Sequence, residues 1–147
     1  MQLNSSRYYS FGATNPSAWS TSSPLKNLFL CSDKYFLAFS SIIFNLFSLI
    51  SVVWWATHFD QASFEIDKQL PDVAVIDVKL DKGDKDGIDL LKKIKKITDL
   101  VPVIMISGHA NVEMAVESLK LGAYEFITKP FATEQLLNFI KQVWSFI

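Results

Sequence analysis

The sequence predicts an α/β protein built on a doubly wound parallel sheet, with a first half that is degenerate or incomplete. From residue 72 onward, short apolar β-branched segments alternate with amphipathic ones. This alternation is typical of a parallel sheet covered by helices on both faces. Polar residues follow the apolar segments, as expected where chemistry takes place at the carboxyl ends of parallel strands. The length of 147 residues suits one domain.

The second half of the chain predicts three strand–helix pairs, because its apolar runs are short and its amphipathic runs have helical spacing. The strands are expected at 72–78, 101–107 and 124–128, and the helices at 87–97, 110–121 and 133–147. In the helix at 110–121 we expect Val112, Ala115, Val116 and Leu119 to face the core. Gly122 follows this helix, where a C-cap glycine is expected.

Charge is distributed unevenly along the chain. Residues 1–58 contain four charged side chains, whereas residues 61–147 contain 11 basic and 13 acidic ones, and the formal net charge is -1. The second half therefore has the mixed charge of a solvated globular surface. The sequence has no clustered excess of Lys and Arg, which direct nucleic-acid binding would require. The single cysteine, Cys31, excludes an internal disulfide and fits a cytoplasmic location.

The amino-terminal part is open to two interpretations. Residues 1–26 are rich in Ser, Asn, Gly and Pro without an apolar period, which predicts an irregular or disordered segment. Residues 35–59 form a stretch of 25 residues without formal charge, long enough to cross a bilayer. The flanking basic residues lie on its amino-terminal side, so the positive-inside rule would place the second half outside the cell. This topology disfavours a membrane span, which we keep as an alternative.

Three residues with complementary chemistry stand at the predicted strand ends: Asp77, Ser107 and Lys129. An aspartate can act as the nucleophile toward a phosphoryl group. A hydroxyl can hydrogen-bond a phosphoryl oxygen, and a lysine can neutralise the charge that develops. Pro130 follows Lys129, so the peptide bond between them can be cis. Each residue alone could be a cap or turn residue, but together they favour a functional site.

The order and spacing of these residues resemble response-regulator receiver domains of two-component systems. The intervals are 30 residues from Asp77 to Ser107 and 22 from Ser107 to Lys129. The segments PDVAVID, DGIDLL, PVIMISG, GAYEF and TKPF agree with the family over residues 61–147. SGHAN and GAYEFITKPF are similar to nitrogen-regulation regulators of the NtrX type. The loop DVKLDKGDKDG is longer than the commonest receiver loop and lacks its proline.

The resemblance implies a flavodoxin-like receiver fold and a role for each residue. Asp77 would be the phosphoacceptor, Ser107 the residue that moves to contact the phosphoryl group, and Lys129 the charge partner. Phe126 matches the switch aromatic that turns inward when the site is occupied. The expected cofactor is Mg²⁺, bound in part by Asp77 and the main-chain carbonyl of Lys79. The expected phosphodonor is a sensor histidine kinase, and homodimerisation through the last two helices and last strand is a candidate.

Receivers also begin with a strand that ends in two or more acidic residues, which bind the metal. Counting back 44 residues from Asp77 gives Asp33, the candidate for this metal ligand. Asp33 lies between Ser32 and Lys34, so one carboxylate replaces the usual pair.

On this register residues 27–147 form one receiver-like domain. Its first half would contain a strand at 27–32, a helix at 35–49, a strand at 51–57 and a helix at 58–70. The alternatives are a membrane segment, or a first half displaced by truncation or a change of reading frame.

The leading functional hypothesis is a cytoplasmic receiver that accepts a phosphoryl group on Asp77, lacks its own DNA-binding output domain and is no enzyme in the usual sense. The main alternative is a non-phosphorylated pseudo-receiver or truncated remnant, at most a protein-interaction module, because the acidic pair is missing. A phosphohydrolase with an aspartate nucleophile would need a second aspartate where Lys79 stands. A membrane-anchored regulator is the fourth hypothesis.

Overall fold

The computed structural model describes residues 27–32, 52–109 and 112–146. The predictions for residues 1–26, for the helix at 35–49 and for Asp33 lie outside these ranges.

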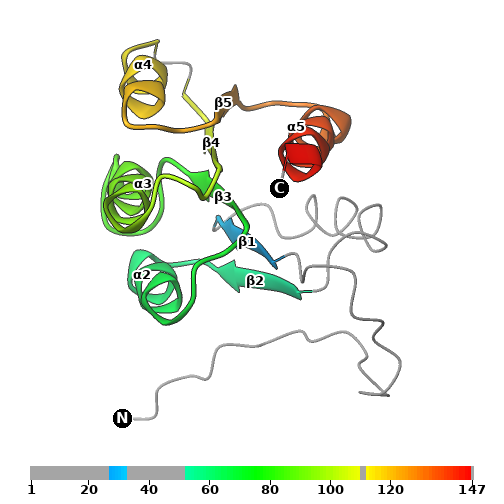
Figure 1. Cartoon of the computed structure of the whole chain (residues 1–147). Helices are drawn as coiled ribbons and strands as arrows, with labels where there is room; N and C mark the ends of the chain where they lie inside the picture. The colour runs from blue at the N-terminus through cyan, green and yellow to red at the C-terminus, as the bar shows by residue number, and fades with distance from the viewer. Residues whose placement is uncertain (1–26, 33–51, 110–111, 147) are drawn as a thin grey trace, which may run out of the picture.

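Strands and helices alternate from β2 onward, and each element predicted within the described residues is present (Figure 1). In chain order they are β1 (Asn27–Cys31), β2 (Val52–Ala56), α2 (Phe59–Lys68), β3 (Val73–Asp77), α3 (Asp86–Ile97), β4 (Val103–Ser107), α4 (Val112–Lys120), β5 (Glu125–Thr128) and α5 (Thr133–Phe146).

All five strands of the described sheet are parallel, in the order β2-β1-β3-β4-β5. The sheet confirms the predicted doubly wound fold. β1 lies between β2 and β3, so residues 27–31 are an internal strand of the sheet. The strands and the helix that the receiver register predicted for the described part of the first half are therefore correct.

The stretch considered as a membrane span, residues 35–59, is described only from Val52 onward. Val52–Ala56 forms β2 and pairs with β1 along its whole length. Within the described ranges, no helix combines the length and the apolar character needed to cross a bilayer.

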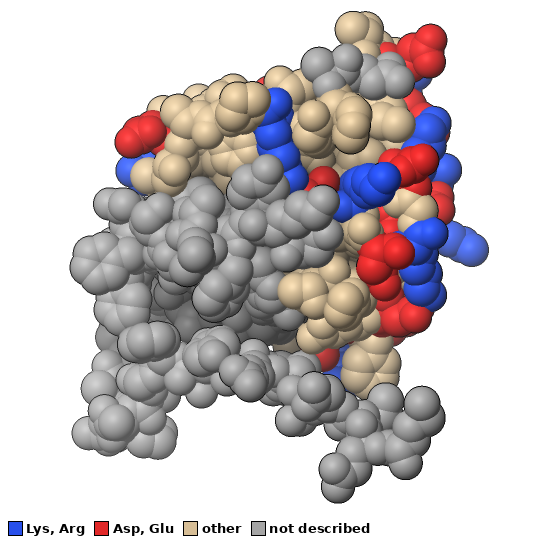
Figure 2. Space-filling view, turned by 180° about the vertical axis from the view of Figure 1, so that it is seen from behind, with Lys and Arg blue, Asp and Glu red and all other residues tan. Residues whose placement is uncertain are grey.

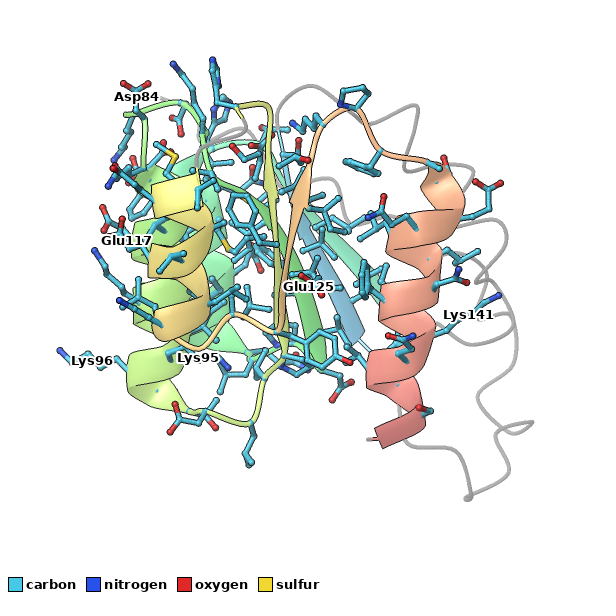
Figure 3. The ribbon with its side chains drawn as sticks, turned by 90° about the horizontal axis from the view of Figure 1, so that it is seen from above. Asp84, Lys95, Lys96, Glu117, Glu125 and Lys141 are labelled. Carbon is cyan, nitrogen blue, oxygen red and sulfur yellow. The ribbon has the colours of Figure 1, made fainter. Side chains whose placement is uncertain are left out.

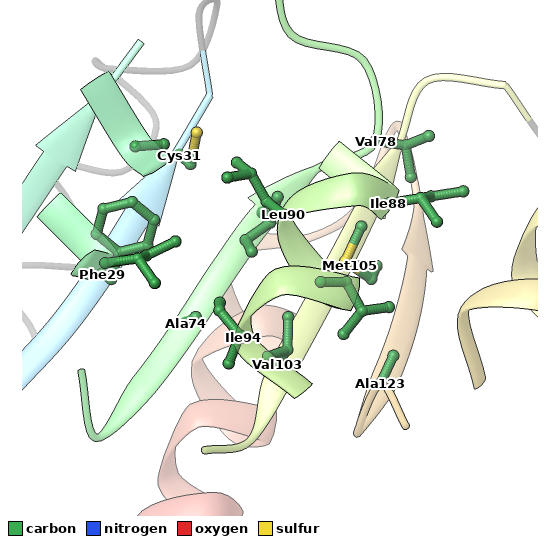
Figure 4. Close-up of a cluster of buried hydrophobic side chains, with 14 of the residues drawn as sticks. Phe29, Cys31, Ala74, Val78, Ile88, Leu90, Ile94, Val103, Met105 and Ala123 are labelled. Atoms are coloured by element: carbon green, nitrogen blue, oxygen red, sulfur yellow. The ribbon is translucent and has the colours of Figure 1, made fainter. Parts of the chain in front are cut away.

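Hydrophobic side chains fill a layer on each face of the sheet. α2, α3 and α4 lie on one face and α5 on the other (Figure 1). Successive strand residues point to opposite faces, so Phe29 packs into the layer beneath α3 and Leu30 into the layer beneath α5. In the first layer, Leu90 and Ile94 of α3 lie over the sheet, with Ile94 beside Val103 (Figure 4). This burial on both faces explains why the strands read as continuous apolar runs.

The inward face predicted for α4 is wrong. Val112, Val116 and Leu119 are 77%, 42% and 47% exposed, whereas Met114 packs against the core and Ser118 is buried. The helix is therefore rotated relative to the prediction: a serine occupies a core position, and apolar residues lie at the surface. α4 ends at Lys120, and Gly122, whose φ is 95°, caps its carboxyl terminus as predicted. The bonds Gly122 N–H to Leu119 O and Ala123 N–H to Ser118 O are those of a Schellman cap.

Replacing Ser118 by alanine is expected to stabilise the protein by about 1 kcal/mol. The Ser118 Oγ is buried without a hydrogen-bond partner among the described residues, so its removal relieves an unsatisfied polar group and improves helix propensity. Urea denaturation would measure the change. Ser145→Ala is the control, because the Ser145 Oγ is exposed and donates to Gln142 O. A loss of stability in Ser118→Ala would show that the hydroxyl makes a stabilising contact.

Candidate functional site

The candidate site lies at the edge where the parallel strands end. Asp77 is the last residue of β3 and Ser107 the last of β4, while Ser32 and Lys129 directly follow β1 and β5. Because Asp77 is in register with Ile106 and Ser107 with Thr128, neighbouring ends are level. The sheet therefore brings together residues that are up to 97 positions apart in the sequence.

The Asp77 carboxylate is held by two side chains and one backbone amide. Asp77 is 4% exposed. Its Oδ2 accepts hydrogen bonds from Lys129 Nζ at 2.5 Å and from Ser32 Oγ at 3.3 Å, and its Oδ1 accepts one from the Lys79 N–H at 3.3 Å. The Lys129 side chain is also largely buried, at 12% exposure. The two charges of such a shielded ion pair attract each other more strongly than those of an exposed pair.

Ser107 ends β4 and Phe126 lies within β5, and their side chains are held in different ways. The buried Ser107 hydroxyl donates to His109 O at 3.0 Å and accepts from the His109 N–H at 3.2 Å, so it is engaged with its own loop. The Ser107 carbonyl accepts from the Lys129 N–H at 2.7 Å. Phe126 is partly buried and packs against the core beneath α3. The peptide bond between Lys129 and Pro130 is cis, as predicted.

The described residues suit Mg²⁺ in ligand type but not fully in charge. Hard cations of this kind prefer carboxylate and carbonyl oxygens, which Asp77 and the Lys79 main chain can supply. However, no group of three or more His, Cys, Asp or Glu side chains within the described ranges could hold a metal ion. The Asp77 Oδ2 also faces the Lys129 ammonium. Asp33, the remaining predicted ligand, is not among the described residues.

Asp86 organises the loop that leads from Asp77 into α3. It is buried, and its Oδ1 accepts from the Leu80 N–H at 2.7 Å while its Oδ2 accepts from the Lys82 and Gly83 N–H groups at 2.9 and 3.3 Å. These bonds satisfy backbone donors that the loop would otherwise leave unpaired. One carboxylate thus fixes the segment that carries the Lys79 carbonyl.

Gly87 allows α3 to start directly against the end of β3. A Cβ at this position would lie 1.9 Å from Asp77 O and 2.9 Å from Val78 Cα, and the Gly87 N–H donates to Val78 O at 2.9 Å. No side chain fits between these two backbones. The position of Asp77 therefore depends on a glycine at position 87.

The same loop is fastened to the amino terminus of α2. Asp81 Oδ1 accepts from the Phe59 N–H at 2.7 Å, which supplies the cap that the His58 side chain does not provide. Lys82 Nζ pairs with Asp60 Oδ1 at 2.5 Å. The Phe59 N–H, followed by smaller contributions that include nearby His58 and Lys82, lowers the pKa of the Asp81 carboxyl below its ordinary value.

Replacing Asp81 by alanine is expected to cost about 1 kcal/mol of stability at neutral pH, because α2 loses its cap. The folded-state pKa of Asp81 is lowered, so the contribution is complete above the unfolded pKa of about 4 and is lost as pH falls through the folded-state pKa. The difference between wild type and Asp81→Ala should therefore shrink at acidic pH. Urea denaturation across pH 2 to 7 would measure it.

The control for Asp81→Ala is Asp84→Ala, in the same loop. The Lys79 ammonium lowers the pKa of Asp84 too, but the Asp84 side chain is 79% exposed, and exposed ion pairs contribute little. No measurable change is expected. A pH-independent effect of Asp81→Ala would contradict the capping role.

Charges of both signs are interleaved along the edge formed by α2, α3 and α4 (Figure 2). Lys93 Nζ pairs with Asp67 at 2.6 Å, and Lys85 Nζ with Glu117 at 2.9 Å. Much of the positive charge on this edge is thus neutralised locally, and the surface seen there has no basic stripe of the kind that binds nucleic acid.

Four residues at or near the site were not singled out by the sequence analysis: Ser32, Asp81, Asp86 and Gly87. Asp86 had a usable signal, because an aspartate at the start of a predicted helix often binds backbone amides. Gly87, next to it, fits a close approach of two backbones. Ser32 and Asp81 gave no such signal, since their partners lie 45 and 22 residues away.

Comparison with known proteins agrees with this geometry. The family described as "Response regulator receiver domain" matches residues 34–141. Nitrogen assimilation regulatory protein NtrX of Azorhizobium caulinodans is 45% identical over 78 residues, which are 53% of this chain and 17% of that protein. The chain thus spans less than a fifth of the length of this curated relative.

Two solved structures show the same fold. The receiver domain of NtrX from Brucella abortus has a TM-score of 0.66 and 32% identity, covering 79% of this chain and 96% of that one. A CheY-like receiver domain protein from Methanospirillum hungatei has a TM-score of 0.70 and 30% identity, covering 81% and 93%. With its parallel sheet, its Asp77–Lys129 pair and these matches, the chain belongs to the response-regulator receiver domain family.

Proposed function

We propose that this chain accepts a phosphoryl group on Asp77 from a sensor histidine kinase. The observation that carries the proposal is the buried Asp77–Lys129 ion pair at the ends of β3 and β5. The carboxyl ends of the strands of an open parallel sheet are where functional groups are expected, and the Asp77 carboxylate lies there. A lysine beside it can neutralise the charge that a phosphoryl group brings.

The transfer step follows from the two oxygens of Asp77. Oδ2 already accepts bonds from Lys129 and Ser32, whereas Oδ1 accepts the single described bond from the Lys79 N–H. We expect Oδ1 to attack the phosphorus of a phosphohistidine. The new O–P bond replaces the P–N bond, and the imidazole leaves with the electron pair and takes up a proton. The product is an aspartyl phosphate, and its phosphoryl oxygens can be contacted by Lys129 Nζ.

Magnesium would be bound by Asp77, the Lys79 carbonyl and Asp33. Bound there, it would neutralise charge on the phosphoryl oxygens. The hydrogen bonds of Asp86 to the Leu80 and Lys82 N–H groups keep the Lys79 backbone in place. We propose that the chain acts as a phosphoryl acceptor in the cytoplasm and not as a turnover enzyme.

The signal would leave the site through Ser107 and Phe126. The Ser107 hydroxyl now binds the backbone of His109, so a contact with a phosphoryl oxygen requires it to exchange that partner. Phe126 is only partly buried, so an inward turn would bury it further. This rearrangement would alter the surface of α4, β5 and α5 and would act on a protein partner, without direct nucleic-acid binding.

The surface of α4, β5 and α5 is also a candidate interface for a homodimer. Val112, Val116 and Leu119 of α4 are exposed, and so is Tyr124 just before β5. Exposed apolar side chains grouped on neighbouring elements favour protein contact.

The test is intact mass of the folded full-length chain after incubation with Mg²⁺ and acetyl phosphate, with Asp77→Asn as the matched control. We expect wild type to gain one acid-labile phosphoryl group and the control to gain none. Gain of the group by both proteins would place the acceptor elsewhere.

The second candidate function is a pseudo-receiver that acts only as a protein-interaction module. The observation that favours it is the serine hydroxyl at position 32, bonded to Asp77, where a receiver carries a carboxylate. Absence of any mass gain in folded wild type would support this candidate over phosphotransfer.

A further inference from the structure

Ser32 is fixed between the two neighbours of β1. Its N–H donates to Ala56 O at 3.2 Å, beside the end of β2, and its Oγ donates to Asp77 Oδ2 at 3.3 Å, at the end of β3. Its residue exposure is 3%. The backbone of Ser32 is thus fixed at the strand ends, and its buried hydroxyl is directed at the Asp77 carboxylate.

Within the described part of the site, an ammonium group already offsets the charge of the Asp77 carboxylate. Among the described residues, Lys129 brings a positive charge to the Asp77 carboxylate, and Ser32 contributes a neutral donor to the same oxygen. A divalent cation would have to share this oxygen with an ammonium group, and it would find a hydroxyl where a second carboxylate could have attracted it. Both effects oppose cation binding.

We propose that Ser32 keeps the divalent-cation affinity of this site low by occupying a ligand position with a neutral hydroxyl. The inference rests on the proposed function, since it concerns the same site. Ser32 is a positioning residue for Asp77. The charge of the side chain at position 32 determines how strongly the site binds a cation. An aspartate at position 32 would place a second carboxylate beside Asp77, and like charges that share a site favour a cation between them.

The experiment is thermal unfolding of the full-length chain as a function of MgCl₂ concentration, without phosphodonor, for wild type, Ser32→Asp and Ser32→Asn. Ligand binding to the native state raises the midpoint according to concentration over Kd. We expect half-maximal stabilisation of wild type at millimolar Mg²⁺ or higher, and at a concentration at least about tenfold lower for Ser32→Asp. Ser32→Asn has nearly the size of the aspartate without its charge and should behave as wild type does.

Equal Mg²⁺ dependence of wild type and Ser32→Asp would overturn the inference, and so would an equal gain in Ser32→Asn. If Ser32→Asp folds only when Mg²⁺ is added, circular dichroism would show the transition and support it. If this variant folds at no Mg²⁺ concentration, calorimetric titration of wild type with MgCl₂ tests the inference instead. A submillimolar Kd for Mg²⁺ would contradict the inference, and a weaker Kd would support it. Failure of the proposed function is separate: Ser32→Asp would then bind Mg²⁺ tightly yet gain no phosphoryl group from acetyl phosphate.

Discussion

Replacing Gly87 by alanine is expected to destabilise the protein by about 3 kcal/mol or more. The new Cβ would lie 1.9 Å from Asp77 O and 2.8 Å from Asp77 C, and both are backbone atoms that cannot turn aside. Either α3 moves away from β3 or the end of β3 is displaced, and each outcome breaks the bond from the Gly87 N–H to Val78 O. Urea denaturation would measure the loss, and phosphorylation of Asp77 should decrease with it.

The matched control is Gly83→Ala in the same loop. A Cβ at Gly83 would have no atom within 4 Å, so this substitution should change stability by less than about 0.5 kcal/mol. Similar stabilities of Gly87→Ala and wild type would show that the two backbones do not approach as closely as described.

Replacing Lys129 by methionine is expected to slow phosphorylation of Asp77 by about 100-fold or more, the usual effect of removing one group that stabilises developing charge. Methionine keeps much of the volume of the lysine side chain and removes the ammonium that contacts Asp77 Oδ2. The rate of mass gain with acetyl phosphate measures the effect, with circular dichroism to confirm that the variant is folded.

Lys95→Met is the matched control, because Lys95 is another partly buried lysine. Its Nζ donates to Asp99 O and Val101 O, and it lies at the opposite end of the molecule from the loop that carries Asp84 (Figure 3). Its phosphorylation rate should match that of wild type. A normal rate in Lys129→Met would remove this lysine from the proposed chemistry.

The second half of the fold could be predicted largely because β3 and β4 are short, continuous apolar runs. β3, Val73–Asp77, is buried along its whole length, and its sequence is apolar up to the aspartate. Asp77 and Lys129 could be paired for the same reason, since two parallel strands ending at the same edge bring their following residues together. The role of each residue in phosphotransfer stays a prediction.

Contacts between distant segments could not be predicted in this way. β1 was identified by its distance from Asp77 and not by its own pattern, so the bond from Ser32 had no local signal. The cap that Asp81 places on α2 joins residues 22 positions apart. The face of α4 was mispredicted because Ser118 is buried while Val112 is exposed, an arrangement that hydrophobic periodicity alone does not indicate.

The most direct test of the central claim is to locate the phosphoryl group after borohydride trapping. An aspartyl phosphate is reduced to homoserine, so peptide mass mapping of the phosphorylated wild-type chain identifies the carboxylate that carried the group. We predict homoserine at position 77 and no reduction of any other Asp or Glu side chain. Homoserine at another carboxylate, with Asp77 intact, would contradict the assignment of Asp77 as the phosphoacceptor.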